Sequence, residues 1–193
     1  MGEPMNTDRL LWLDIETTAL SPHEGAAIIE VGVIITDRQL QRIAAGCWLV
    51  KPPDGTRWEM WPMQQHATSG LLHDAMTAGR GRGVVEAELC ALLDLHFPGC
   101  ATNRRARPPL GGNSVHFDRA WLKALMPDVE RRLHHRHLDM SSVWLFADVV
   151  AGLQGAQRPR REVAHTAIED LEACLEDARR YLALMRGEEV DRG

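Results

Sequence analysis

Two carboxylates stand one residue apart at the end of an apolar run, and no other feature constrains the fold of this chain as strongly. The segment 9–18 places Asp14 and Glu16 directly after Leu10, Leu11, Trp12 and Leu13. Because strand side chains alternate between faces, Asp14 and Glu16 project to the same side. Like charges this close repel each other unless a cation lies between them, and a hard divalent ion with oxygen ligands fits best. The alternative interpretation is a strand that ends in a polar turn.

Composition limits the classes of protein that this chain can represent. Its 193 residues are 45% hydrophobic and 25% charged, which is typical of a globular protein and not of a disordered or membrane one. No apolar run approaches the roughly 18 residues of a membrane span, and the N-terminus lacks signal-peptide features, so we expect a cytoplasmic protein without a membrane partner. Four widely spaced cysteines indicate neither a zinc site nor a disulfide framework. The net charge of −5 argues against a nucleic-acid coat protein but is compatible with a nuclease.

The order of expected elements predicts one α/β domain over residues 1–193, with its core at about 9–186. Three consecutive strands without intervening helices favour an antiparallel start to a mixed sheet. We expect strands at 9–18, 26–36, 40–50, 110–112 and 136–138. We expect helices at 62–67, 70–77, 84–96, 116–125, 127–135, 141–150 and 166–186. Segments 98–109 and 152–161 are rich in Arg, Pro and Gly and are predicted to be exposed connections.

Two later stretches carry further candidates. Asp118 lies in the first turn of an expected helix, where an acid also serves as an ordinary dipole or capping residue. The preceding Ser114 hydroxyl and backbone N–H groups lie at a helix N-terminus, which is suited to phosphate. His165 and Asp170 are both near one helix end. His165 is either an ordinary polar residue or, beside a metal-bound water, a general base with a suitable pKa.

Taken together, Asp14-x-Glu16, then Asp118, then His165-x4-Asp170 resembles the DEDDh group of 3′-to-5′ exonucleases, and within it the oligoribonuclease branch. The likeness extends to Trp61 with the stretch 66–71, to 112–127 and to 136–141. The resemblance implies a ribonuclease-H-like fold, with a mixed five-stranded sheet and helices on both of its faces.

The resemblance also implies two-metal hydrolysis of a phosphodiester. Asp14, Glu16 and Asp170 would hold one of two Mg²⁺ or Mn²⁺ ions, and Asp14 would bridge to the second. Asp118 would complete the acidic ring. His165 would take a proton from the attacking water.

By the same resemblance, six residues would bind substrate. Leu20 would wedge between the two terminal bases, Trp61 would stack on the 3′ nucleotide, and His66 would lie near the terminal sugar. Ser114, Arg136 and Ser141 would cap the 5′ phosphate of very short RNAs. The alternatives are core positions for Leu20 and Trp61 and a solvated basic face for Arg136.

The resemblance therefore predicts a homodimeric exoribonuclease that acts on short RNA oligonucleotides. The alternatives are a single-stranded DNA exonuclease of the proofreading or repair type and a non-catalytic nucleic-acid-binding module. Two departures bear on substrate choice. Thr17-Thr18-Ala19-Leu20 stands where the family usually has Met-Thr-Gly-Leu, and His135 stands where oligoribonuclease presents a tyrosine from the partner subunit.

Overall fold

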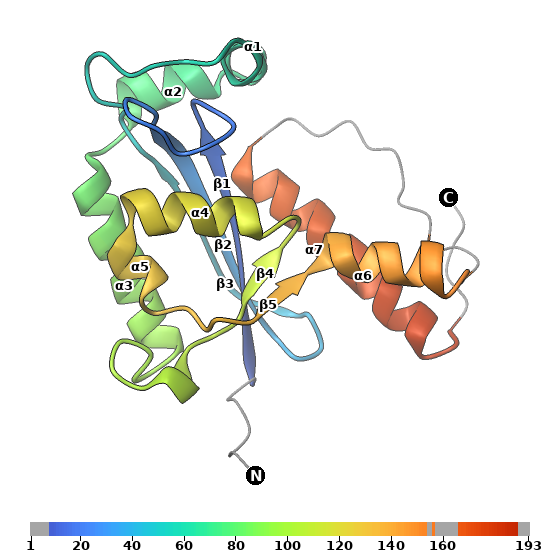
Figure 1. Cartoon of the computed structure of the whole chain (residues 1–193). Coiled ribbons are helices and arrows are strands. Elements are labelled where there is room, and N and C mark those ends of the chain that lie inside the picture. The colour runs from blue at the N-terminus through green and yellow to red at the C-terminus, as the bar shows by residue number, and fades with distance from the viewer. Residues whose placement is uncertain (1–7, 154–155, 157–165, 189–193) are drawn as a thin grey trace.

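The computed structural model describes residues 8–153, 156 and 166–188, and its centre is a mixed five-stranded sheet (Figure 1). The strand order is β3-β2-β1-β4-β5. The strands are β1 (Arg9–Thr17), β2 (Ile28–Asp37), β3 (Arg42–Leu49), β4 (Leu110–Gly112) and β5 (His137–Asp139). Antiparallel pairing joins β1 to β2 and β2 to β3, whereas β4 runs parallel to β1 and β5 parallel to β4. The predicted mixed sheet with an antiparallel start is confirmed.

The interior position of β2 in the sheet agrees with the character of its side chains. It is apolar and β-branched along most of its length and is buried on both faces, as expected for a strand flanked on both edges and covered on both sides. Its register with β1 sets Gly32 opposite Asp14 and Glu30 opposite Glu16. The two carboxylates of β1 therefore lie opposite Gly32, the one glycine of β2, and Glu30, the acid in the buried part of that strand.

Helices cover both faces of the sheet (Figure 1). On one face, α3 (Arg82–His96), α4 (His116–Leu125) and α5 (Pro127–Glu130) pack with Leu11, Leu13 and Ile15. On the other face, α6 (Met140–Leu145), the π-helical turn η2 (Phe146–Val150) and α7 (Ala167–Met185) pack with Trp12 and Ile34. The short helices α1 (Met60–Ser69) and α2 (Leu71–Ala78) lie at the upper end of the sheet in Figure 1, and η1 (Arg104–Ala106) is a 3₁₀ turn. Within the described residues, none of the helices is both long and apolar enough to span a membrane.

The expected helix at 127–135 is wrong beyond Glu130, where α5 ends. The next backbone bonds, from Arg132 N–H to the Val129 carbonyl and from Leu133 N–H to the Glu130 carbonyl, are turn bonds. His134 N–H then donates to the Pro108 carbonyl at 2.8 Å, which draws the chain beside the segment leading into β4. Pairing of β5 with β4 thus prevails over local helix propensity. The expected helix at 141–150 is α-helical only to Leu145 and continues as η2.

Gly32 allows β2 to pass very close to the first residue of α7. A Cβ atom at Gly32 would lie 2.9 Å from both the Cβ and the carbonyl carbon of Ala167. Such a contact is shorter than real Cβ atoms make, and one of the atoms in question is backbone. Glycine is therefore the residue that lets α7 begin directly against the sheet.

We predict that Gly32→Ala lowers the free energy of unfolding by about 1–3 kcal/mol, because α7 must move away from β2 to admit the methyl group. Urea denaturation measures this change. Gly83→Ala is the matched control: a Cβ there meets nothing within 4 Å, and alanine suits a helix, so stability should stay level or rise slightly. Equal effects of the two substitutions would contradict the close-approach argument.

Candidate active site

Three carboxylates converge at the end of β1. One oxygen from each of Asp14, Glu16 and Asp170 lies within 4.8 Å of the other two. Asp14 and Glu16 alternate with Leu13 and Ile15 and therefore share the Trp12 face of β1, the face that packs against α7. Asp170 lies in the first turn of α7. The alternation of β1 and the start of α7 together bring residues 14 and 170 to one point.

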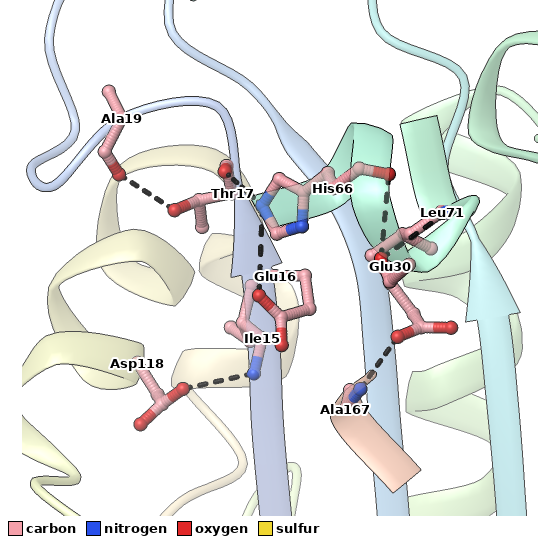
Figure 2. A network of polar contacts seen from close by, with 10 residues as sticks. Ile15, Glu16, Thr17, Ala19, Glu30, His66, Leu71, Asp118 and Ala167 are labelled. Carbon is pink, nitrogen blue, oxygen red and sulfur yellow. Dashed lines mark hydrogen bonds and ion pairs between the residues drawn. The ribbon is translucent and has the colours of Figure 1, made fainter. Parts of the chain in front are cut away.

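Asp118 joins this cluster from the opposite helical layer. It lies in the first turn of α4, is only 3% exposed, and lines the same cavity as Asp14, Glu16 and Asp170, whose volume is about 290 Å³. Its Oδ1 accepts a hydrogen bond of 3.0 Å from the Ile15 N–H, between the two carboxylates of β1 (Figure 2). That bond fixes the carboxylate of Asp118 relative to the strand.

Burial and mutual repulsion raise the pKa values of the carboxylates in this cluster. Burial is the largest cause that raises the pKa of Glu16 from 4.5 to about 8, followed by the charges of Asp170, Glu30 and Asp118. Burial also raises the pKa of Asp14 well above its ordinary value, with Asp118 next in effect. The pKa of Asp118 rises to about 7, again mainly through burial and despite backbone N–H donors. Carboxylates with such pKa values retain much of their protonation at neutral pH, and a nearby cation would favour their ionised forms.

The donor set fits a divalent metal ion. Carboxylate oxygens are the ligands that Mg²⁺, Mn²⁺ and Ca²⁺ prefer, and a bound ion would reverse the electrostatics that raise these pKa values. The acidic cluster is therefore able to hold metal ions, with Asp14, Glu16 and Asp170 as the nearest ligands.

Glu30 is a buried carboxylate beside this cluster that the sequence analysis did not single out. It is 5% exposed, and its Oε2 accepts a hydrogen bond of 2.6 Å from the N–H of Ala167, the first residue of α7 (Figure 2). An acid suits this position because the N-terminus of a helix carries unpaired N–H groups and partial positive charge. Glu30 thus anchors the turn that carries Asp170. The sequence feature that could have identified Glu30 is that it is the one acid in the apolar run of residues 26–36.

The turn after β1 is tied to the start of α1. Thr18 O accepts from the Glu59 N–H at 2.9 Å, and Glu59 Oε2 accepts from the Leu20 N–H at 3.0 Å. Glu59 immediately precedes α1, whose first turn carries Trp61. These bonds hold Leu20 and Trp61 on one wall of the cavity, 58% and 56% exposed respectively. Neither side chain is a core residue, so the core alternative is wrong for both.

His66 is placed deep in the same wall. It is 3% exposed, and its Nε2 lies 2.9 Å from the Thr17 carbonyl oxygen and 3.7 Å from Glu16 Oε2 (Figure 2). His66 therefore contacts a carboxylate of the cluster as well as lining the cavity.

Ser114 and Ser141 meet on the opposite side. Their hydroxyl oxygens are 3.2 Å apart, and Ser114 lines the cavity. The Ser114 N–H, a candidate phosphate donor by sequence, already donates to Asp139 Oδ1 and Ser141 Oγ, both at 3.1 Å. The Ser114 N–H is therefore already engaged, and of these two residues only Ser114 lines the cavity.

Among the described candidates, Arg136 does not line the cavity. Arg136 is exposed on the segment before β5, and among the described residues its side chain makes no hydrogen bond or ion pair. His165, the expected general base, lies outside the described residues.

Solved structures with a similar fold include Exonuclease I. The chain aligns with the zinc-bound E. coli ExoI–ssDNA complex at a TM-score of 0.68 and 16% identity, covering 94% of this chain and 41% of that one. It aligns with Exonuclease I from Methylocaldum szegediense at a TM-score of 0.67 and 18% identity, covering 95% and 41%. The chain thus spans about two fifths of these proteins, and at such identity the likeness establishes the fold. The structure thus combines a ribonuclease-H-like sheet with a carboxylate cluster at the end of β1.

Sequence comparison identifies the family. A model described as Exonuclease matches residues 11–176. The Oligoribonuclease of Marinobacter nauticus is 33% identical over 185 residues, covering 91% of this chain and 95% of its own. The Oligoribonuclease of Coxiella burnetii is 35% identical over 179 residues, covering 91% and 93%. The chain belongs to this exonuclease family and is a hydrolase, as its resemblance implied.

We predict that the metal-free protein loses stability as pH rises from about 4.5 to about 8. The folded state retains a proton on Glu16 that the unfolded chain releases over this range, so this contribution is complete below pH 4.5 and lost above pH 8. The slope is at most about 1.4 kcal/mol per pH unit for each such proton. Urea denaturation in EDTA measures it, and Mn²⁺ should stabilise more at pH 8 than at pH 5.

Glu16→Gln is the informative variant, because it removes the titrating group at nearly constant volume. Its stability should fall less steeply over the same pH range than that of the parent. An unchanged slope in this variant, or Mn²⁺ stabilisation that is equal at both pH values, would refute the role of the cluster.

Proposed function

We propose that this protein is a metal-dependent 3′-to-5′ exonuclease that releases nucleoside 5′-monophosphates from short oligoribonucleotides. The proposal rests on one observation: the same cavity is lined by the carboxylates of Asp14, Glu16, Asp118 and Asp170 and by the exposed side chains of Leu20 and Trp61. One wall suits a metal-bound phosphate and the other suits stacked bases. Relatives named Oligoribonuclease, matched over 95% and 93% of their own lengths, support RNA as the substrate.

The four carboxylates are the proposed ligands of two Mg²⁺ or Mn²⁺ ions. When bound, such ions lower the pKa of water and neutralise charge on the attacking and leaving oxygens. Asp14, Glu16 and Asp170 hold the ions from the α7 side, and Asp118 closes the ring from α4. Glu30 keeps α7 and its Asp170 in place through the N–H of Ala167.

Substrate orientation follows from the two walls. Leu20 and Trp61 take the two 3′-terminal bases by stacking, which tolerates any sequence and is worth about 1–3 kcal/mol per base. His66 lies beneath them, next to Glu16. On the far side, the hydroxyls of Ser114 and Ser141 bind a phosphate on the 5′ side, with the exposed Arg136 as the charge that completes the cap. His165 accepts the proton of the attacking water.

The alternative substrate is single-stranded DNA, which is the ligand in the Exonuclease I complex of the same fold. The two proposals differ in the substrate length and in the kind of sugar, ribose or deoxyribose, that the enzyme favours. A site capped on the 5′ side turns over diribonucleotides faster than long strands, whereas a DNA exonuclease favours longer single-stranded DNA.

We predict that Asp14→Asn lowers the rate of Mn²⁺-dependent diribonucleotide hydrolysis by about 10³-fold or more, because an amide is a poor ligand for two cations. Chromatographic detection of nucleoside monophosphates from diribonucleotide, 24-mer RNA and 24-mer single-stranded DNA measures activity and preference together. Asp54→Asn, an exposed loop position, is the matched control and should retain parental activity. Retained activity in Asp14→Asn would refute the mechanism, and faster hydrolysis of 24-mer DNA than of diribonucleotide would refute the substrate.

We also propose that the protein forms a homodimer, as its resemblance implied, through the exposed apolar surface of α6 and η2. Leu145, Phe146, Val149 and Val150 are 47–70% exposed there. Contiguous apolar surface of this kind commonly marks an interface. Phe146→Glu should shift the mass in sedimentation experiments from dimer to monomer, whereas Leu95→Glu, at a position 69% exposed on α3, should not. A monomeric parent protein would contradict the proposal. The cytoplasmic location stays a prediction.

A further inference from the structure

A second cavity, of about 270 Å³, is lined mainly by cationic side chains. It lies between the 98–109 connection, α4 and the 131–135 turn, which the fold brings together below α4 (Figure 1). We call it the basic pocket and define it by Arg104, Arg107, Arg119, Arg131, His134 and His135. It shares no lining residue with the carboxylate cavity.

The charge of this pocket is only partly neutralised. Glu130, the one acid in its wall, is already paired with Arg119 at 2.9 Å. The Nε of Arg107 donates to the carbonyl oxygen of Cys100 at 3.1 Å, and among the described residues its guanidinium has no carboxylate partner. In the part of the chain that the structure describes, Arg104 is exposed and has no ion-pair partner. At least two guanidinium groups thus remain available for an anion.

The lowered pKa of His134 is consistent with the excess of positive charge in the pocket. The rings of His134 and His135 lie 4.1 Å apart between centroids. Burial is the main cause that lowers the pKa of His134, and the nearby positive charges of His135, Arg136, Arg119 and Arg107 lower it further. A neighbourhood that resists one more proton is one that favours a bound anion.

The pocket is connected to the carboxylate site along the edge of the sheet. β5 is the outermost strand next to β4, and it begins three residues after His134. At about 3.3 Å per residue, the five residues from His134 to Asp139 span at most about 16 Å. Asp139 accepts from the backbone N–H groups of Ser114 and Ser141, and Arg136 and His137 are exposed between the two sites. On α4, Asp118 faces the carboxylate cavity while its neighbour Arg119 faces the pocket.

We propose that the basic pocket binds backbone phosphates of a single-stranded nucleic acid whose 3′ end occupies the carboxylate site. Guanidinium groups match the geometry of phosphate, and grooves for single strands combine such positive charge with ring systems. A dinucleotide has no phosphate beyond its scissile and 5′-terminal ones, which the carboxylate site and the Ser114 and Ser141 hydroxyls are proposed to bind, whereas a longer strand has further phosphates for the pocket. The pocket therefore selectively adds affinity for longer strands. This inference rests on the proposed exonuclease function and extends it to substrate length.

The test compares two substrates in Mn²⁺: a 5′-phosphorylated diadenylate and a 5′-labelled 12-mer oligoadenylate. In Arg104→Ala/Arg107→Ala, we expect KM for the 12-mer to rise about 5- to 10-fold, with kcat and all constants for the diadenylate unchanged. The slope of log KM for the 12-mer against log salt should fall by about 1.4, because each lost phosphate contact on a single strand contributes about 0.7.

Matched controls separate a local effect from a change in net charge. Arg38→Ala/Arg82→Ala removes two exposed arginines outside the pocket and should leave both substrates unchanged. Because Arg107 also bonds to the backbone of Cys100, Arg104→Ala alone provides a variant without structural contacts and should raise KM for the 12-mer about 2- to 3-fold.

Two outcomes would overturn the proposal. One is an unchanged ratio of the 12-mer to diadenylate KM values in both pocket variants. The other is an equal loss on both substrates, which would make the pocket a support for the fold. Neither resembles failure of the proposed function, in which the parent protein would not hydrolyse the diadenylate at all.

Discussion

Repulsion among buried carboxylates is the constraint on which the rest of this structure depends. Oxygens of Asp14, Glu16 and Asp170 lie within 4.8 Å of one another, although burial and neighbouring charges raise the pKa values of Asp14 and Glu16. Such a cluster persists only where the surrounding fold over-determines it. Here the fold does so with backbone contacts: Ile15 N–H holds Asp118, and Glu30 with Gly32 seats the first turn of α7. Stability is given up at this point in return for a site that a cation can complete.

The turn from Thr17 to Leu20 joins the chemistry of the site to its base-binding wall. Thr17 Oγ1 donates to the Ala19 carbonyl, and Thr18 Oγ1 accepts from the Ala27 N–H. These side-chain bonds shape a turn in which this chain has Ala19 where the family usually has glycine. Glu59, which accepts a hydrogen bond from the Leu20 N–H, links this turn to the start of α1. Of the two threonine hydroxyl groups only that of Thr17 departs from the family pattern, and the turn still presents Leu20 at the cavity wall.

The sequence predicted most of the fold, because its strongest patterns are local. The long apolar strands, α4 and α7 all follow from periodicity, caps or charge within the element itself. The predictions that failed concern features that depend on contacts between distant parts of the chain. Helix 127–135 ends early because His134 is bound to Pro108, and the role of Glu30 depends on a helix 137 residues away. The candidate ligands were found through their order along the chain. Arg136 and the basic pocket depend on side-chain placement and pairing, which spacing does not determine.

The distribution of charge gives the two cavities complementary tasks. A carboxylate cluster repels nucleic acid until cations occupy it, so attraction of a polyanion has to originate elsewhere. The chain has a net charge of −5, yet Arg104, Arg107 and Arg119 gather beside the edge strand that leads to Ser114 and Ser141. Exposed charges act over roughly one Debye length, about 8 Å in physiological salt, so only arginines along this route steer a bound strand. Separation of the sites lets metal binding govern cleavage while the arginines govern the length of strand that is retained.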